Sequence, residues 1–254
     1  MDKMLQKIEE NYQLVEGIIN KHEENQSKLR FNRPFIVVSD VAQQYFCEKK
    51  VEMQYIHGRV ETEEKLVGTE AHEKLLEDSV KVEREDLFQQ IFGEEPVFAL
   101  EMLLLTRYKD TILAGRPDSI LFQKGYPLIV FEYKFSKSGT VYMNHHVQAR
   151  TYGIILRNMG FDTNNLFYAI IVADPKTRNN KKLREKIVEA VLMNGTKEAV
   201  LNLKDVAIHI HKFNHENAEK DLDWAIDFWN KSREAILTTN QNKCKSCEYN
   251  KECQ

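Results

Sequence analysis

Two carboxylates and one lysine in the middle of the chain have the types and spacing of a hydrolytic metal site. Asp118 ends the tetrapeptide Gly-Arg-Pro-Asp, and Glu132 stands two residues before Lys134, directly after an apolar run. Side chains two apart on a strand project from the same face, so Glu132 and Lys134 are expected side by side. We expect Asp118 on the preceding strand, where a short turn lets the two carboxylates converge.

This trio predicts a particular chemistry. A carboxylate next to buried residues is unfavourable unless it is paired or binds a cation. Two hard oxygen ligands suit Mg²⁺ or Mn²⁺. A neighbouring lysine can orient a water molecule or stabilise the negative charge that develops when a phosphodiester is attacked. The competing interpretation is an ion pair between Glu132 and Lys134 on a solvated sheet face, beside an ordinary turn aspartate.

Three polar side chains on predicted helices could belong to the same site. His72 follows Gly68 by four residues on a helix before the strands. Gln148 and Tyr152 are four residues apart on the helix that follows Lys134, so they share one helix face. Taken singly, each has an ordinary explanation as a surface histidine or as the polar edge of a helix.

The four cysteines predict a second metal site. Cys47 stands alone, whereas Cys244, Cys247 and Cys253 lie within the last eleven residues. Four thiolates fit one tetrahedral site, and a [4Fe–4S] cluster is favoured over zinc because zinc sites more often use two Cys-x-x-Cys pairs. Zinc and four unconnected thiols are the alternatives. Ligands from both ends of the chain would clasp the C-terminal tail to the helix of Cys47, as a structural element and not as an electron carrier.

Hydrophobic periodicity predicts a single α/β domain that positions these residues, a mixed sheet with helices on its faces. An amphipathic helix is expected over 1–30, as an N-terminal appendage or a partner-binding helix. We expect the appendage to span 1–34 and the main domain to span 35–254. We expect further helices at 41–55, 61–80, 144–158, 181–193 and 216–237. We expect strands at 97–107, 111–122, 128–135, 166–173 and 206–213.

Together, in this order, the motifs resemble those of the PD-(D/E)xK nuclease superfamily. Pro117-Asp118 and Glu132-Tyr-Lys134 match the motif that names it, and Gln148-x-x-x-Tyr152 matches its Gln-x-x-x-Tyr motif. The cysteines, with Cys47 followed by basic residues, resemble the RecB-type iron–sulfur nucleases, especially the CRISPR-associated exonucleases of spacer acquisition. The resemblance covers roughly 35–253 and implies a restriction-endonuclease-like fold.

The resemblance also implies roles for individual residues. His72, Asp118 and Glu132 would ligate Mn²⁺ or Mg²⁺, together with the backbone carbonyl of Tyr133. Lys134 would position or activate the attacking water. Gln148 and Tyr152 would support the site or hold DNA. The cysteines would hold a [4Fe–4S] cluster, and the reaction would be phosphodiester hydrolysis.

Charge and missing motifs narrow the choice of partner. The net charge of −3 excludes a wholly basic DNA-coating protein but leaves room for a local basic surface. The segment from 174 to 186 contains six basic residues and only two acidic ones. This excess of positive charge predicts contacts to DNA phosphates or, alternatively, the solvated start of a helix. The basic residues are Lys176, Arg178, Lys181, Lys182, Arg184 and Lys186. The sequence contains no P-loop, so single-stranded or overhanging ends are the expected substrate.

The cellular setting is predicted from the N-terminal residues and from the family resemblance. The first residues lack the apolar segment of a signal peptide, so a reducing cytoplasm is expected. CRISPR integrase proteins are the partners that the resemblance suggests, in antiviral defence. A repair, replication or virus-encoded nuclease of the same fold is the first alternative, and a non-catalytic DNA-binding protein is the second.

Overall fold

The computed structural model describes the chain over residues 2–24, 28–62, 69–70, 74, 81–180, 182–195 and 197–253. The predicted helix over 61–80, with His72, lies largely outside this part of the chain. Within the described residues, no helix combines the length and apolar composition needed to cross a membrane.

The described residues form two sheets. The larger has six strands in the order β2-β5-β6-β7-β9-β8, in which β6 and β7 are parallel and all other neighbours are antiparallel. These strands are β2 (Val97–Leu100), β5 (Ser119–Gln123), β6 (Tyr126–Phe135), β7 (Phe167–Ala173), β8 (Ala199–Leu203) and β9 (Val206–Lys212). The smaller sheet, in the order β1-β4-β3, consists of β1 (Ile36–Val37), β3 (Leu104–Tyr108) and β4 (Thr111–Gly115).

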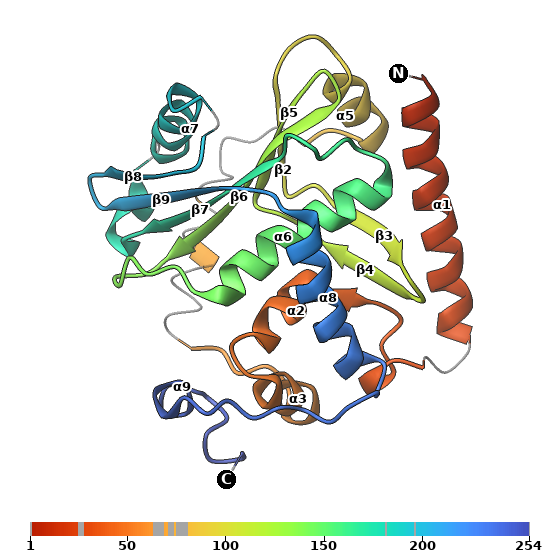
Figure 1. Cartoon of the computed structure of the whole chain (residues 1–254), viewed down its shortest axis with the longest axis vertical. Helices are drawn as coiled ribbons and strands as arrows, with labels where there is room; N and C mark the ends of the chain where they lie inside the picture. Colours follow the sequence, from red (N-terminus) through yellow and green to blue (C-terminus); the bar gives the residue numbers. More distant parts are fainter. Residues whose placement is uncertain are drawn as a thin grey trace.

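Helices cover both faces of the larger sheet, which confirms the predicted mixed α/β, restriction-endonuclease-like architecture. Figure 1 shows α6 crossing one face with α8 beside it. The opposite face packs against the buried side of α7. The helices are α1 (Asp2–Glu24), η1 (Arg30–Asn32), α2 (Val38–Gln44), α3 (Glu48–His57), α5 (Arg84–Ile91), α6 (Met143–Met159), η2 (Pro175–Asn179), α7 (Leu183–Met193), α8 (His215–Trp229) and α9 (Gln241–Lys245).

Three predicted elements are interrupted, and β8 was not predicted. The expected helix over 41–55 is interrupted at Cys47, which has an extended backbone and immediately precedes the first residue of α3. The expected strand over 97–107 divides into β2 and β3, which belong to different sheets, with Glu101 at φ 45° between them. The expected strand over 111–122 divides at Pro117, which has no N–H for a sheet ladder. The final helix, α8, ends at Trp229, well before residue 237.

The N-terminal helix α1 is amphipathic as predicted, and it also contributes to the main hydrophobic core. Ile8, Tyr12 and Val15 are buried in the same cluster as residues of β3 and α6. The Asn11 side chain donates to the carbonyl of Leu105 in β3 at 2.6 Å. The division of the chain into an appendage over 1–34 and a domain over 35–254 stays a prediction. The packing of α1 against β3 gives a way to test it.

Truncating the buried face of α1 should therefore destabilise the whole domain. We expect Ile8→Ala to lower the free energy of unfolding by about 2–5 kcal/mol, because the side chain is fully buried and its removal leaves a cavity. Leu14→Ala is the matched control, since Leu14 is 55% exposed on the same helix, and its effect should stay below about 0.5 kcal/mol. Urea unfolding followed by circular dichroism measures both, and equal midpoints for wild type and Ile8→Ala would show a separable appendage.

The C-terminal tail is clasped to the N-terminal helices, as predicted. Figure 1 shows α9 and the end of the chain lying beside α3. Lys50 of α3 pairs with Glu248 at 2.8 Å, and the Tyr249 hydroxyl donates to the carbonyl of Gly58 at 2.6 Å. The Lys243 ammonium donates to the carbonyl of Phe46 at 2.9 Å. Polar contacts thus attach the tail on both sides of Cys47.

Candidate active site

The two predicted carboxylates meet between β5 and β6. Asp118 immediately precedes β5 and does not lie on a strand, which corrects the sequence prediction. Its Oδ2 atom accepts a 2.6 Å hydrogen bond from the backbone N–H of Tyr133, which places the Asp118 carboxylate beside the Glu132-Tyr-Lys134 segment of β6. Pro117 explains the difference, because it ends the ladder just before the aspartate and frees that side chain to turn toward β6.

Lys134 connects Glu132 to the next helix. Its Nζ atom donates to Glu132 Oε1 at 2.7 Å and to Gln148 Oε1 at 3.0 Å. The Tyr152 hydroxyl, one turn further along α6, donates to the carbonyl of Arg116 at 2.9 Å. The structure therefore joins the predicted Gln-x-x-x-Tyr pair both to the lysine and to the segment that carries Asp118.

Gly115, the last residue of β4, allows α6 to pack closely against the end of that strand. A Cβ atom at residue 115 would lie 2.8 Å from the Tyr152 ring and 2.6 Å from Val38, distances that side chains do not tolerate. Any larger residue would therefore push α6 away from the strand end. The arrangement of the site depends on this glycine as well as on the charged residues.

The electrostatics of the site favour a bound cation. Burial, and then the negative charge of Glu132, raises the pKa of Asp118 well above its ordinary value. Burial alone would lower the pKa of Lys134, but the charges of Glu132 and Asp118 outweigh it and raise that pKa. Lys134 thus stays protonated, and its single ammonium group lies beside two buried carboxyl groups.

The donor set fits a divalent metal ion. Glu132 is 2% exposed, and its Oε2 atom is buried with no hydrogen-bond partner among the described residues. Such an orphaned oxygen, next to a second carboxylate, is a suitable ligand for Mg²⁺ or Mn²⁺. His72, the other predicted ligand, lies outside the described residues. Within the described residues, no group of three or more His, Cys, Asp or Glu side chains is already arranged to hold a metal ion.

Comparisons with known proteins agree with this geometry. The sequence profile of the PD-(D/E)XK nuclease superfamily matches residues 15–254. The chain belongs to the PD-(D/E)XK nuclease superfamily. Members of this superfamily are divalent-metal-dependent nucleases.

The crystal structure of SSO0001 is similar, with 14% sequence identity and a TM-score of 0.48, over 93% of this chain and 91% of that one. A comparison with curated protein sequences finds no match.

The four cysteines of this superfamily member line a single cavity. Cys47, Cys244, Cys247 and Cys253 border a space of about 240 Å³ between the α2–α3 junction and the tail. All four are free thiols. Burial raises the pKa of Cys247 and of Cys253, and the nearby Cys47 raises both further. The raised pKa values favour neutral thiols while the cavity holds no cation, and thiolates this close together would repel one another unless a positive charge offset them.

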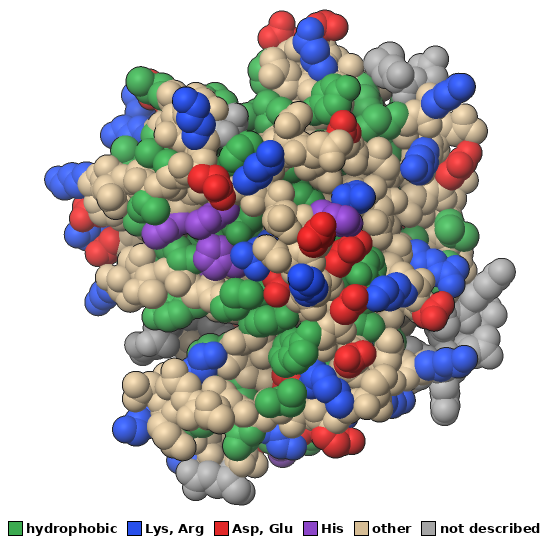
Figure 2. Space-filling model, in the orientation of Figure 1, with side chains coloured by type: hydrophobic (Ala, Val, Ile, Leu, Met, Phe, Trp, Pro, Cys, Tyr) green, Lys and Arg blue, Asp and Glu red, His purple; other side chains and the backbone are tan. Residues whose placement is uncertain are grey.

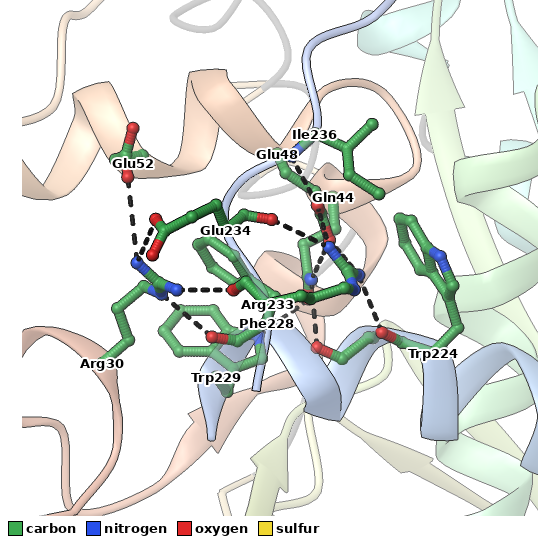
Figure 3. Close-up of polar contacts among 11 residues, drawn as sticks. Arg30, Gln44, Glu48, Glu52, Trp224, Phe228, Trp229, Arg233, Glu234 and Ile236 are labelled. Carbon is green, nitrogen blue, oxygen red and sulfur yellow. Dashed lines mark hydrogen bonds and ion pairs between the residues drawn. The ribbon is translucent and has the colours of Figure 1, made fainter. Parts of the chain in front are cut away.

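A buried polar network that sequence reasoning missed holds the same region together (Figure 3). Glu48, which follows Cys47, is 1% exposed and accepts hydrogen bonds from Arg233 at 2.5 and 2.6 Å and from Ile236 N at 2.9 Å. Gln44 accepts from the Trp229 indole at 2.7 Å and donates to Glu48 at 2.9 Å. No local signal identifies these pairs, because Glu48 and Arg233 are 185 residues apart.

Breaking this network from one side should be strongly destabilising. We expect Arg233→Met to lower the free energy of unfolding by about 3–5 kcal/mol, because it leaves the Glu48 carboxylate buried without its counter-charge. The double variant Glu48→Gln/Arg233→Met should recover part of the loss. Glu94→Gln, which removes the exposed pair with Lys124, is the control and should cost less than about 1 kcal/mol. Denaturant unfolding measures all three, and equal losses for Arg233→Met and Glu94→Gln would contradict the assignment.

The predicted DNA-contacting segment is only partly described. Lys176 pairs with Asp205 at 2.9 Å and with Asp174 at 3.6 Å, so acidic neighbours already offset its charge. Lys182 is exposed just before α7. Lys181 and the side chain of Arg178 lie outside the described residues. DNA contact by this segment stays a prediction.

A histidine patch lies where α6 crosses β7 and β9, and Figure 2 shows it on the face of the molecule turned to the viewer. His146 Nδ1 lies 3.1 Å from the Tyr168 hydroxyl, and its ring lies 4.8 Å from that of His211. Burial, and then the charge of His211, lowers the pKa of His146 to about 4. The patch is therefore neutral at pH 7 and adds no positive charge for phosphates.

Proposed function

We propose that this protein is a metal-dependent DNA exonuclease that hydrolyses phosphodiester bonds at single-stranded or overhanging ends. The observation that carries the proposal is the convergence of Asp118, Glu132 and Lys134, with a buried Glu132 oxygen that has no hydrogen-bond partner in the described part of the chain. In a chain of this superfamily, that set of groups supports catalysis better than it supports DNA binding alone.

The residues supply distinct parts of the hydrolysis. Asp118 and Glu132, together with the Tyr133 carbonyl and His72, would hold the divalent ion, which supplies Lewis acidity when bound. The Lys134 ammonium, oriented by Glu132 and Gln148, can hold the attacking water and offset charge on the phosphate. Water supplies the oxygen that attacks phosphorus, the P–O bond to the leaving nucleotide breaks, and a proton from water ends on the leaving oxygen.

We further propose that the four cysteines hold a [4Fe–4S] cluster, which would place the protein among the RecB-type iron–sulfur nucleases. The support is that all four thiols line one cavity, including the distant Cys47. Trimming of DNA ends before CRISPR spacer acquisition, with integrase proteins as partners, is the setting that this combination favours. A repair, replication or viral nuclease is the alternative, and activity that is indifferent to a CRISPR integrase would favour it.

End-labelled DNA digestion tests the proposed function. Protein purified without oxygen is incubated with single-stranded, overhanging, blunt and closed circular DNA in Mn²⁺, in Mg²⁺ or in EDTA. We expect cleavage of single strands and overhangs only with metal, and lower affinity as salt rises, since phosphate contacts release counterions. Efficient cutting of closed circles without any action on single strands would contradict the end preference. Tight DNA binding without cleavage in either metal would establish the non-catalytic alternative.

A further inference from the structure

The loop that joins β6 to α6 stands out from the surface next to the catalytic lysine. In Figure 1 it runs along the left of the view, from the end of β6 to the start of α6. Its first residue, Ser136, is tied to β7 by a 2.9 Å bond from its N–H to the carbonyl of Ala173. Residues 137–140 are exposed, and a Cβ atom added to Gly139 would meet nothing within 4 Å. The loop is thus anchored at its base and open to solvent beyond it.

Tyr142 presents a half-exposed aromatic ring at the end of this loop. It is 53% exposed, and its neighbour Met143 is 45% exposed. The ring of His145 meets the Tyr142 ring edge-on at 5.6 Å, and His145 Nδ1 accepts from the Tyr142 N–H at 3.4 Å. Burial, and then the positive charge of Lys134, lowers the pKa of His145 to about 4, so the imidazole is neutral. His145 therefore supports the tyrosine and does not act as a phosphate-binding cation.

The position of Tyr142 relative to the catalytic groups suits a base close to the cleaved bond. Gln148, which contacts Lys134 Nζ at 3.0 Å, follows Tyr142 by six residues. Six residues of helix correspond to about 9 Å along the axis. Nucleotides in a stacked strand advance by about 3.4 Å each, so this spacing corresponds to two or three nucleotides. Lys137, on the same loop, is exposed and adds a positive charge to it.

We propose that Tyr142 stacks on an unpaired nucleobase of the substrate and so selects single-stranded DNA at this active site. The inference rests on the proposed nuclease function and adds the residue that would read the strand. Stacking on an aromatic side chain works with any base, because every base has a π-face. A base inside a duplex already stacks on its neighbours, so a paired strand offers Tyr142 no free face.

A binding experiment in EDTA separates this role from catalysis. Fluorescence anisotropy compares a labelled oligodeoxythymidine with an abasic oligonucleotide of equal length. We expect Tyr142→Ala to weaken oligodeoxythymidine binding by about tenfold, on the scale of one lost base stack, and to leave abasic binding unchanged. Tyr142→Trp should retain wild-type affinity for both. Tyr126→Ala is the matched control, because Tyr126 is also 53% exposed but lies at the opposite end of β6.

Other outcomes distinguish the failures. Equal losses on both oligonucleotides would show a phosphate-binding or structural role for Tyr142 and overturn the inference. Unchanged oligodeoxythymidine binding by Tyr142→Ala would overturn it as well, while leaving the nuclease function intact. Wild-type protein that binds neither oligonucleotide would overturn the proposed function itself, together with the inference that rests on it.

Discussion

Replacing Glu132 with Gln is expected to lower the rate of DNA cleavage by about a thousandfold or more. The amide keeps the shape of the side chain but removes a charged metal ligand, which contributes several kcal/mol to stabilising the transition state. Each 1.36 kcal/mol corresponds to a factor of about ten in rate. Initial rates on end-labelled single-stranded DNA at saturating Mn²⁺ measure the effect. Asp118→Asn and Lys134→Ala should have effects of similar size.

The same variant should fold normally. Glu132 carries a charge that is buried beside Asp118, and its charge contributes to raising the pKa of that neighbour. Removing it relieves repulsion in the metal-free protein, so the melting temperature of Glu132→Gln should equal or exceed that of the wild type. Glu94→Gln, at an exposed carboxylate, should leave the rate unchanged and cost less than about 1 kcal/mol of stability. Wild-type cleavage by Glu132→Gln would exclude this site as the catalytic centre.

Replacing Cys47 with Ser is expected to remove nearly all bound iron. Protein purified without oxygen should be brown and contain about four irons per chain, following the ligation rule for [4Fe–4S] clusters. Cys47 is the proposed ligand that comes from outside the tail, and it lines the same cavity as the other three cysteines. Iron analysis and visible absorption measure the loss. Ser246→Ala is the control, since Ser246 is exposed between Cys244 and Cys247 and should leave the iron content unchanged.

The tail should respond to this loss only in part. The contacts from Lys50 to Glu248 and from Tyr249 to Gly58 do not involve a cysteine, so they continue to attach the tail without a cluster. We therefore expect faster but incomplete proteolysis of the tail in Cys47→Ser. One zinc per chain that still requires Cys47 would replace the cluster by a zinc site. Metal content independent of Cys47 would contradict a four-cysteine site of either kind.

Local spacing in the sequence was sufficient to predict which polar side chains of β6 and α6 lie together. Glu132 and Lys134 share a strand face because strand side chains alternate, and Gln148 and Tyr152 share a helix face because a turn has 3.6 residues. The alternation and length of the apolar runs likewise predicted β6, β7 and β9. These features depend on residues close together in the chain, and short-range geometry decides them.

Features that depend on distant residues were decided only by the tertiary structure. Asp118 leaves the strand because Pro117 ends one ladder and the strands on either side belong to different sheets. The Glu48–Arg233 ion pair joins residues 185 positions apart, and the helix break at Cys47 lies directly before Glu48; no periodicity in the sequence encodes either feature. The sequence of α1 predicts an amphipathic helix. In the structure its apolar face packs against β3 and contributes to the main hydrophobic core. Burial depends on which surfaces meet in space, and an amphipathic pattern identifies an apolar face without identifying what covers it.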